Sequence, residues 1–369
     1  MESHMQAKVS PRRESSNRRL HRLWGPCVGH VITTRFSSVI AIIGACTFCL
    51  VLFNLRDTGV PSAPVHPEGI DGFRYVESGR RALQQVRAVN TYRNDTVAVL
   101  STTNKMRRTL PNVIIIGARK AGTRALLEYL GIHPQVVSAS REIHFFSDEE
   151  NYARGMRWYQ AQMPLSAPGQ LTLEKTPNYL ISNVTPERVH RMNSSVLLLL
   201  TLRHPVTRAI SDYTQILANR NGRGQASKDF ATLALHGRTG EVNQAYKPVY
   251  ISTYHLHLAR WLKLFPLAQI HIIDGDRLIT EPLEELRAVE TFLGLEHFFT
   301  SDTVYFNATR GFHCMRRPVN GSFVDSCLGA SKGRSHPHVE QAVRTKLSQY
   351  FYKHNQILFN MIGRSFDWT

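Results

Sequence analysis

Short apolar runs alternate with helical stretches over the last two-thirds of the chain. The runs that predict strands are 112–117, 196–203 and 270–274. The stretches that predict helices after them are 123–130, 205–217 and 282–295. Continuous apolar strands joined by helices are what a parallel sheet buried on both faces requires. The pattern therefore predicts one α/β domain over residues 110–369, with three layers (α/β/α) and a central parallel sheet, and ligands collect beyond the carboxyl ends of such strands.

A separate apolar segment lies near the N-terminus. Residues 39–53 carry no charge, and with its flanks the segment covers 36–55, which as a helix crosses a bilayer core of roughly 30 Å. Seven basic and two acidic residues precede it, a bias that places the N-terminus in the cytosol. We therefore expect a cytoplasmic basic tail over 1–35, a transmembrane signal anchor over 36–55 and a lumenal stem over 56–109. A cleaved signal peptide is the competing interpretation, but no small-x-small pattern follows the run.

Basic residues outnumber acidic ones along the whole chain. Lys and Arg total 45 against 28 Asp and Glu, for a formal net charge of +17. The first 35 residues contribute +5, so +12 remains on the rest of the chain. Such a surface attracts polyanions without naming one. The predicted anchor disfavours a nucleic-acid partner.

Glycosylation sequons and cysteines agree with a lumenal body. Asn-x-Ser/Thr triplets, each a possible glycan acceptor, begin at Asn94, Asn183, Asn193, Asn307 and Asn320. Of the five cysteines, only Cys314 and Cys327 follow the apolar segment. In an oxidising lumen this pair is expected to form a disulfide, and two unpaired buried thiols are the alternative.

The turn after the first predicted strand has the features of an anion-binding loop. Gly117 and Gly122 keep the GxxxxG spacing of a P-loop, and Thr123 follows, but the lysine is Lys120, two positions before the second glycine. Backbone N–H groups and a helix N-terminus can still bind an anionic group, which need not be a nucleoside triphosphate. The alternative is a structural turn that binds no ligand.

A second candidate anion site follows the strand at 196–203. Arg203 ends that strand, and Ser211 lies about two turns into the next helix. Together an arginine at a strand end and a serine on the adjoining helix can bind a second phosphate. The alternative is that Arg203 only caps the sheet and Ser211 faces solvent.

These motifs, with several others, resemble the sulfotransferases that use 3′-phosphoadenylyl sulfate (PAPS), and specifically the heparan sulfate glucosamine 3-O-sulfotransferases. The resemblance runs from about residue 111 to the C-terminal "GRSFDW". Its segments are "IIIGARKAGTRALLEYLGIHP", "EIHFF", "EKTPNYL", "LRHPVTRAISDYTQ", "IIDGDRLITEPL", "YFNATRGFHC" and "SKGRSHP". It implies a sulfotransferase domain over 110–369 with a phosphosulfate-binding loop, acting in the Golgi as a single-pass type II membrane enzyme on heparan sulfate chains.

The resemblance also implies the donor site. PAPS is the sulfate donor, PAP is the product, and no catalytic metal is required. The residues expected to bind the nucleotide are Lys120, Ala121, Gly122, Thr123, Arg124, Arg203, Ser211, Lys332, Gly333, Arg334, Ser335 and His336. The last five form a segment that is expected to close over the nucleotide.

At the acceptor, the reaction needs a base for the hydroxyl proton and positive charge on the leaving phosphate. The resemblance assigns Glu142 as the base. His144, two residues on, would orient it from the same side if this segment is extended, and Lys120 and Lys175 would be the cations. Residues expected to contact the acceptor are Arg119, Glu142, His144, Lys175, Thr176, Pro177 and Asn178. Other interpretations are a Glu142 paired with Arg141 at the surface, a core His144 and a solvated Lys175.

Three positions depart from the family pattern. Ala121 replaces a usual glycine, Ser147 a usual aspartate and His313 a usual tyrosine. A methyl group at Ala121 is tolerated only if its φ is negative. The alternative functions are a carbohydrate sulfotransferase with another acceptor position, and a heparan-sulfate-binding membrane protein with weakened catalysis. The preferred sulfation pattern and the oligomeric state are not determined by the sequence.

Overall fold

The computed structural model describes residues 105–319, 321–329 and 334–368. The predicted tail and anchor, and nearly all of the predicted stem, lie outside these residues. So do Asn94, Asn320, Lys332 and Gly333. Among the described helices, none is both long and apolar enough to cross a bilayer.

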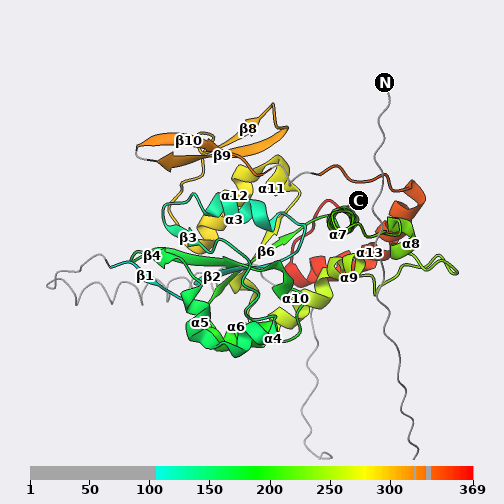
Figure 1. Ribbon diagram of the computed structural model, residues 1–369, viewed down its shortest axis with the longest axis horizontal. Coiled ribbons are helices and arrows are strands. Elements are labelled where there is room, and N and C mark those ends of the chain that lie inside the picture. Colours follow the sequence, from blue (N-terminus) through cyan, green and yellow to red (C-terminus); the bar gives the residue numbers. More distant parts are fainter. Residues whose placement is uncertain (1–104, 320, 330–333, 369) are drawn as a thin grey trace, which may run out of the picture. The chain divides into compact units, whose positions relative to one another are not determined.

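A five-stranded parallel sheet organises the domain (Figure 1). Its strand order is β3-β5-β2-β6-β7, and every neighbouring pair is parallel. The strands are β2 (Val113–Gly117), β3 (Val136–Ser138), β5 (Leu171–Lys175), β6 (Leu197–Leu202) and β7 (Ile270–Asp274). The predicted strands correspond to β2, β6 and β7, so the predicted α/β class with a central parallel sheet is confirmed, whereas β3 and β5 were not predicted.

Helices cover both faces of the sheet because side chains of a strand alternate between faces. Ile114 and Ile116 of β2 pack with one set of helices, and Val113 and Ile115 pack with the other. The first face is covered mainly by α5 (Gly155–Ala161), α6 (Thr185–Met192), α10 (Tyr254–Leu262) and α13 (Gln341–Ile362). The second is covered by α3 (Thr123–Leu130), α11 (Arg277–Thr280) and α12 (Pro282–Leu293). The predicted helices correspond to α3, α7 (Pro205–Asn221) and α12.

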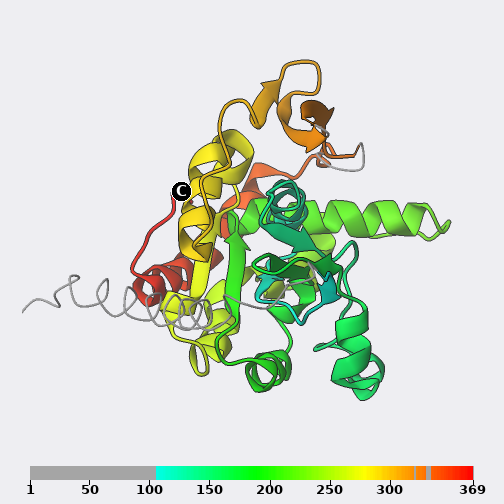
Figure 2. The same ribbon diagram turned by 90° about the vertical axis from the view of Figure 1, so that its left-hand side faces the viewer.

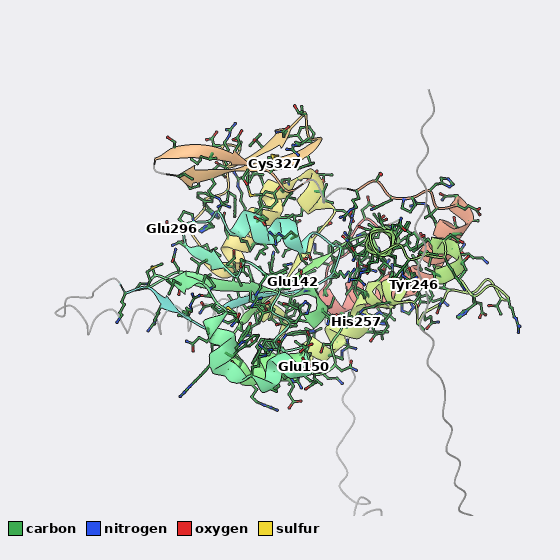
Figure 3. All side chains as sticks on the ribbon, viewed as in Figure 1. Glu142, Glu150, Tyr246, His257, Glu296 and Cys327 are labelled. Carbon is green, nitrogen blue, oxygen red and sulfur yellow. A yellow bond between two sulfur atoms is a disulfide. The ribbon has the colours of Figure 1, made fainter. Side chains whose placement is uncertain are left out.

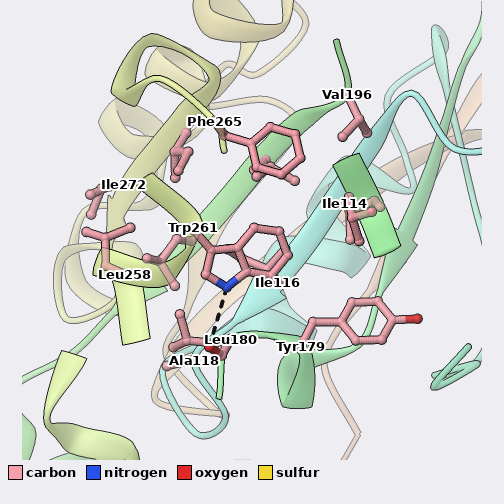
Figure 4. Close-up of a cluster of buried hydrophobic side chains, with 14 of the residues drawn as sticks. Ile114, Ile116, Ala118, Tyr179, Leu180, Val196, Leu258, Trp261, Phe265 and Ile272 are labelled. Atoms are coloured by element: carbon pink, nitrogen blue, oxygen red, sulfur yellow. Dashed lines mark hydrogen bonds between the residues drawn. The ribbon is translucent and has the colours of Figure 1, made fainter. Parts of the chain in front are cut away.

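The α10 helix is central to the first core cluster. Trp261 is fully buried, and its indole nitrogen donates to the carbonyl of Leu180 at 3.4 Å (Figure 4). A buried indole N–H needs such an acceptor. The aromatic and leucine spacing of this segment, Tyr254–Leu262, is typical of a core helix.

The remaining elements are short or peripheral. The helical ones are α4 (Glu149–Ala153), η1 (Pro177–Tyr179), α8 (Phe230–Ala234), α9 (Lys247–Ser252) and η2 (Leu267–Gln269). The strands are β1 (Arg107–Arg108), β4 (Leu165–Ser166), β8 (Val304–Asn307), β9 (Phe312–Val319) and β10 (Ser322–Ser326). The last three form an antiparallel sheet beside α11 and α12, which both views show (Figures 1 and 2). In it Cys314 and Cys327 form a disulfide with a Cα–Cα distance of 4.5 Å.

Candidate active site

The candidate site lies where the parallel strands end. The loop after β2 carries Lys120, β5 ends at Lys175, and Arg203 directly follows β6. Because the carboxyl ends of parallel strands meet at one edge of a sheet, these three cations share that edge. Glu142, from the segment after β3, is labelled beside the central sheet in Figure 3.

The loop between β2 and α3 is fixed on two sides. The N–H of Ala118 donates to Thr201 O at 2.8 Å, and the Thr201 hydroxyl donates to Gly117 O at 3.0 Å. The buried Arg208 of α7 donates to Arg119 O at 3.0 Å. A loop held by its carbonyls keeps its N–H groups in a constant direction, as anion binding requires.

Left-handed backbone in this loop falls on Lys120, with φ of 71°, and on Gly122, with φ of 101°. Ala121 is not among the positive-φ residues. Alanine in place of the usual glycine at position 121 therefore causes no left-handed backbone strain. Gly122 caps α3, whose N-terminus begins at the buried Thr123.

Arg203 follows the end of β6, and Ser211 lies on the adjoining helix α7. Arg203 is half-buried, and its Nε donates to Asp276 Oδ1 at 2.7 Å. Ser211 is only 8% exposed on α7, so the solvent-facing alternative is wrong. His204 precedes α7, and Pro205 occupies its first turn, where the missing N–H costs no hydrogen bond.

The described part of the closing segment lies beside these groups. Arg334 donates to Gln215 Oε1 of α7 at 2.7 Å. Burial lowers the pKa of His336, and the positive charges of Arg203, Lys120 and Arg344 lower it further. His336 therefore lies within the electrostatic field of both predicted anion sites.

Glu142 forms a cluster with two basic residues. Its Oε1 accepts a hydrogen bond from Lys175 Nζ, and its Oε2 lies 3.5 Å from His144 Nε2. Burial by itself raises the pKa of Glu142, but the hydrogen bonds and charges of His144 and Lys175 outweigh it and lower the pKa to about 2. The hydrogen bond to Glu142 raises the pKa of His144. Each cation thus favours the ionised carboxylate.

The structure decides among the alternative interpretations of this cluster. Arg141 donates to Gln162 at 2.7 Å, so it is not the partner of Glu142. Lys175 is 4% exposed and therefore not a solvated lysine, and the side chain of His144 is 42% exposed and therefore not a core histidine. The two side chains do not meet through extended alternation as predicted, because His144 has φ of 56°.

A buried carboxyl group lies behind this cluster and was missed by sequence reasoning. Glu174 is fully buried and accepts hydrogen bonds from the hydroxyls of Thr176 and Tyr159. Burial raises its pKa to about 7. The N–H of His144 donates to the Thr176 hydroxyl at 3.4 Å, which links Glu174 to the segment that holds Glu142. The signal for Glu174 in the sequence was its position directly before Lys175, the lysine that ends β5.

Other predicted residues have different surroundings. Arg119 pairs with Asp212 of α7 at 2.9 Å, and Arg124 pairs with Glu128 on α3. Pro177 is buried, and Asn178 is half-buried in η1 next to Thr176, while Ser335 is exposed. Among the departures, the buried hydroxyl of Ser147 has no hydrogen-bond partner in the described part of the chain. His313 Nδ1 lies 3.1 Å from Ile279 O.

No cluster of three or more His, Cys, Asp or Glu residues within the described ranges is arranged to hold a metal ion. The cations at the sheet edge are instead suited to an anionic ligand with two charged ends. One end would meet the loop at Lys120, and the other would meet Arg203 and Ser211.

Comparisons with known proteins agree with this arrangement. The sulfotransferase domain family matches residues 110–358, which gives the class of protein. A solved sulfotransferase from Alicyclobacillus acidocaldarius is similar in fold, with a TM-score of 0.53 and 21% identity over 70% of this chain and 98% of that one.

More specific relatives are found among named proteins. Heparan sulfate glucosamine 3-O-sulfotransferase 5 of Mus musculus is 52% identical over 70% of this chain and 74% of the relative. Heparan sulfate glucosamine 3-O-sulfotransferase 6 of Homo sapiens is 42% identical over 71% of this chain and 75% of the relative. This chain belongs to the heparan sulfate glucosamine 3-O-sulfotransferase family.

Proposed function

We propose that this protein transfers the sulfuryl group of PAPS to the 3-hydroxyl of glucosamine units in heparan sulfate. The relatives named for this reaction support the proposal, and so does the sulfotransferase domain. One structural observation carries the mechanism. A carboxylate, Glu142, lies in contact with a buried lysine at the sheet edge where the donor loop ends.

The residues at the sheet edge fit PAPS, a nucleotide with an anionic group at each end of its ribose. Lys120 and the N–H groups before α3 would bind the 5′-phosphosulfate. Arg203 and Ser211 would bind the 3′-phosphate, and the segment containing His336 would cover the nucleotide. The positive field that lowers the pKa of His336 supports this assignment. When bound, PAPS supplies an activated sulfuryl group on a phosphate leaving group.

Glu142 is assigned as the base. Its pKa of about 2 keeps it ionised at neutral pH, so a proton acceptor is always present there. To accept the sugar proton, one oxygen must give up its present partner. Oε2 has the longer contact, 3.5 Å to His144, and we assign it as the accepting atom. Oε1 stays with Lys175, which fixes the carboxylate for in-line transfer.

In the proposed transfer step, one bond to sulfur forms while another breaks. The bond from the sugar oxygen to sulfur forms as the bond from sulfur to the bridging oxygen breaks, and the electron pair stays on the 5′-phosphate of PAP. The hydroxyl proton moves to Glu142. Lys120 and Lys175 stabilise the charge that develops on the phosphate.

We also propose that the protein is a Golgi type II membrane protein with a lumenal catalytic domain. The apolar segment 36–55, with basic residues before it, supports an anchor. The disulfide supports an oxidising compartment. The asparagines of two sequons, Asn183 and Asn193, are exposed and accessible to a glycan, and Asn307 is half-buried.

The experiment that tests the function is a donor-transfer assay on defined heparan oligosaccharides, with the product mapped by disaccharide analysis. The expected result is new sulfate on the 3-hydroxyl of glucosamine. Sulfate at another position would refute the specificity and indicate a different carbohydrate sulfotransferase. Binding of the oligosaccharide and of PAP without transfer would refute the enzymatic proposal and indicate a heparan-sulfate-binding protein.

A further inference from the structure

The turn that follows β7 contacts both predicted anion sites. Asp276 uses one carboxylate oxygen for Arg203 Nε at 2.7 Å and the other for the N–H of His204 at 2.8 Å. Its own backbone N–H donates to Asp274 Oδ1 at 2.9 Å. Asp276 is therefore a fixed acceptor, because the turn that carries it is itself hydrogen-bonded.

The middle residue of this turn lies directly against the loop that precedes α3. Gly275 donates to Leu202 O at 2.6 Å. A Cβ atom at this position would lie 2.3 Å from Ala121 O and 2.7 Å from Leu202 O, and both neighbours are backbone atoms that cannot rotate away. Only glycine permits this approach. The turn 274–276 thus spans from the loop to Arg203.

The contact to Arg203 determines which side of the guanidinium remains for a ligand. A guanidinium donates from Nε and from two terminal nitrogens in a planar arrangement. Among the described residues, the Arg203 guanidinium makes one hydrogen bond, which runs from its Nε to Asp276. The terminal nitrogens are then left for a bidentate contact with a phosphate.

We propose that Asp276 is a positioning residue, which orients Arg203 toward the 3′-phosphate of the donor, while Gly275 sets the spacing between Arg203 and the loop. This inference rests on the proposed function, because it takes Arg203 as the 3′-phosphate ligand. It makes turn 274–276 the element that holds the two anion sites at the separation of the two ends of PAPS.

A different role for Asp276 predicts that its removal changes nucleotide affinity in the opposite direction. If Asp276 merely neutralised Arg203, it would compete with the phosphate, and its removal would strengthen nucleotide binding. If it orients Arg203, its removal releases a flexible side chain that must be ordered again on binding. Nucleotide affinity then falls, because the rotamer entropy of an arginine is lost at that moment.

The test measures the binding of two nucleotides by calorimetry. PAP carries the 3′-phosphate, and adenosine 5′-phosphate lacks it. For Asp276→Ala and Asp276→Asn we expect PAP affinity to fall about tenfold, with the affinity for adenosine 5′-phosphate unchanged. For Gly275→Ala we expect both affinities to fall, because the loop itself is displaced. A merely structural role for Asp276 would weaken both nucleotides alike.

Two further variants make the outcome decisive. Asp325→Ala removes an exposed aspartate that pairs with Arg316 Nε at 3.3 Å on the antiparallel sheet, and it should leave PAP affinity unchanged. Arg203→Ala should weaken PAP binding, and adding Asp276→Ala to it should cause no further loss. If Arg203→Ala has no effect, the proposed donor site is wrong. If Arg203→Ala weakens PAP binding but the Asp276 variants do not weaken it, or strengthen it, the positioning role is overturned.

Discussion

Replacing Lys175 with methionine tests the two effects that the proposed mechanism assigns to this buried lysine. Methionine has a similar length and no charge, so it removes the partner of Glu142 Oε1 with little change in volume. The lowering of the Glu142 pKa from its usual 4.5 to about 2 makes it a stronger acid by about 300-fold, and Lys175 supplies part of this effect together with His144.

The loss of the lysine charge and the change in the Glu142 pKa are detected at different pH values. At pH 7 Glu142 stays ionised with or without Lys175, so the change in rate there reports the charge lost from the leaving phosphate together with the lost contact that fixes the carboxylate. We expect kcat to fall about 10²–10³-fold, as on removal of one electrostatic contact to a transition state. The Glu142 pKa rises in the variant, so the acid limb of the kcat/KM profile moves to higher pH.

The assay is an initial-rate measurement with radiolabelled PAPS and a heparan oligosaccharide from pH 4 to pH 8, over the range in which circular dichroism shows both proteins folded. Lys346→Met is the control, because Lys346 is exposed and, among the residues that the structure describes, hydrogen-bonds only to a backbone carbonyl, Gly240 O at 3.0 Å. A variant rate equal to the parent rate at pH 7 would refute the role of Lys175. In the parent, a Glu142 pKa of about 2 places the acid limb below this range, so the variant should show a fall in kcat/KM toward pH 4 that the parent lacks, and a profile without this fall would show that Glu142 does not govern the limb.

Three further predictions concern stability. Burial lowers the pKa values of His257 and His271 to about 4, so below pH 6.5 the unfolded chain binds more protons than the folded protein. The urea midpoint should therefore fall steadily from pH 7 to pH 4, and a constant midpoint would contradict this. Burial raises the pKa of Glu174 to about 7, so this carboxyl opposes the two histidines, and Glu174→Gln should make the rise in urea midpoint from pH 5 to pH 7 larger than in the parent; an equal rise in both proteins would contradict this. The Cys314–Cys327 disulfide joins residues 13 apart, so replacing both cysteines with serine should lower the free energy of unfolding by about 3 kcal/mol. PAP affinity should not change. Loss of PAP binding would show that the antiparallel sheet belongs to the donor site.

Much of the sheet could be predicted because its central strands are buried on both faces. The runs at β2 and β6 are nearly all Val, Ile and Leu, and β7 has three Ile in five residues, which is typical of strands covered on both sides. The strand β5 was missed because Leu171–Lys175 contains a threonine and two charged residues, although four of its five positions are buried. Its charges are tolerated because each is hydrogen-bonded, Lys175 to Glu142 and Glu174 to Tyr159 and Thr176, and periodicity does not reveal these contacts.

The candidate site was predicted in part for a similar reason. Resemblance identified Glu142 and Lys175, and the structure brings their side chains into contact. The carboxylates of Glu174 and Asp276 were overlooked. Asp276 pairs with Arg203, which is far from it in the sequence, whereas the short-range hydrogen bond from Thr176 to Glu174 depends on the burial of β5, which was not predicted. The contact between His144 and Glu142 was expected and is present, but His144 has a left-handed backbone, which the motif does not indicate.

The most direct test of the central claim is the single-turnover rate of Glu142→Gln on a heparan oligosaccharide. Glutamine keeps the size of the side chain but cannot accept the hydroxyl proton. The account predicts a rate at least about 100-fold lower than that of the parent, with unchanged PAP affinity, and 3-O-sulfated glucosamine as the parent product. A Glu142→Gln enzyme that transfers sulfate as fast as the parent would contradict it.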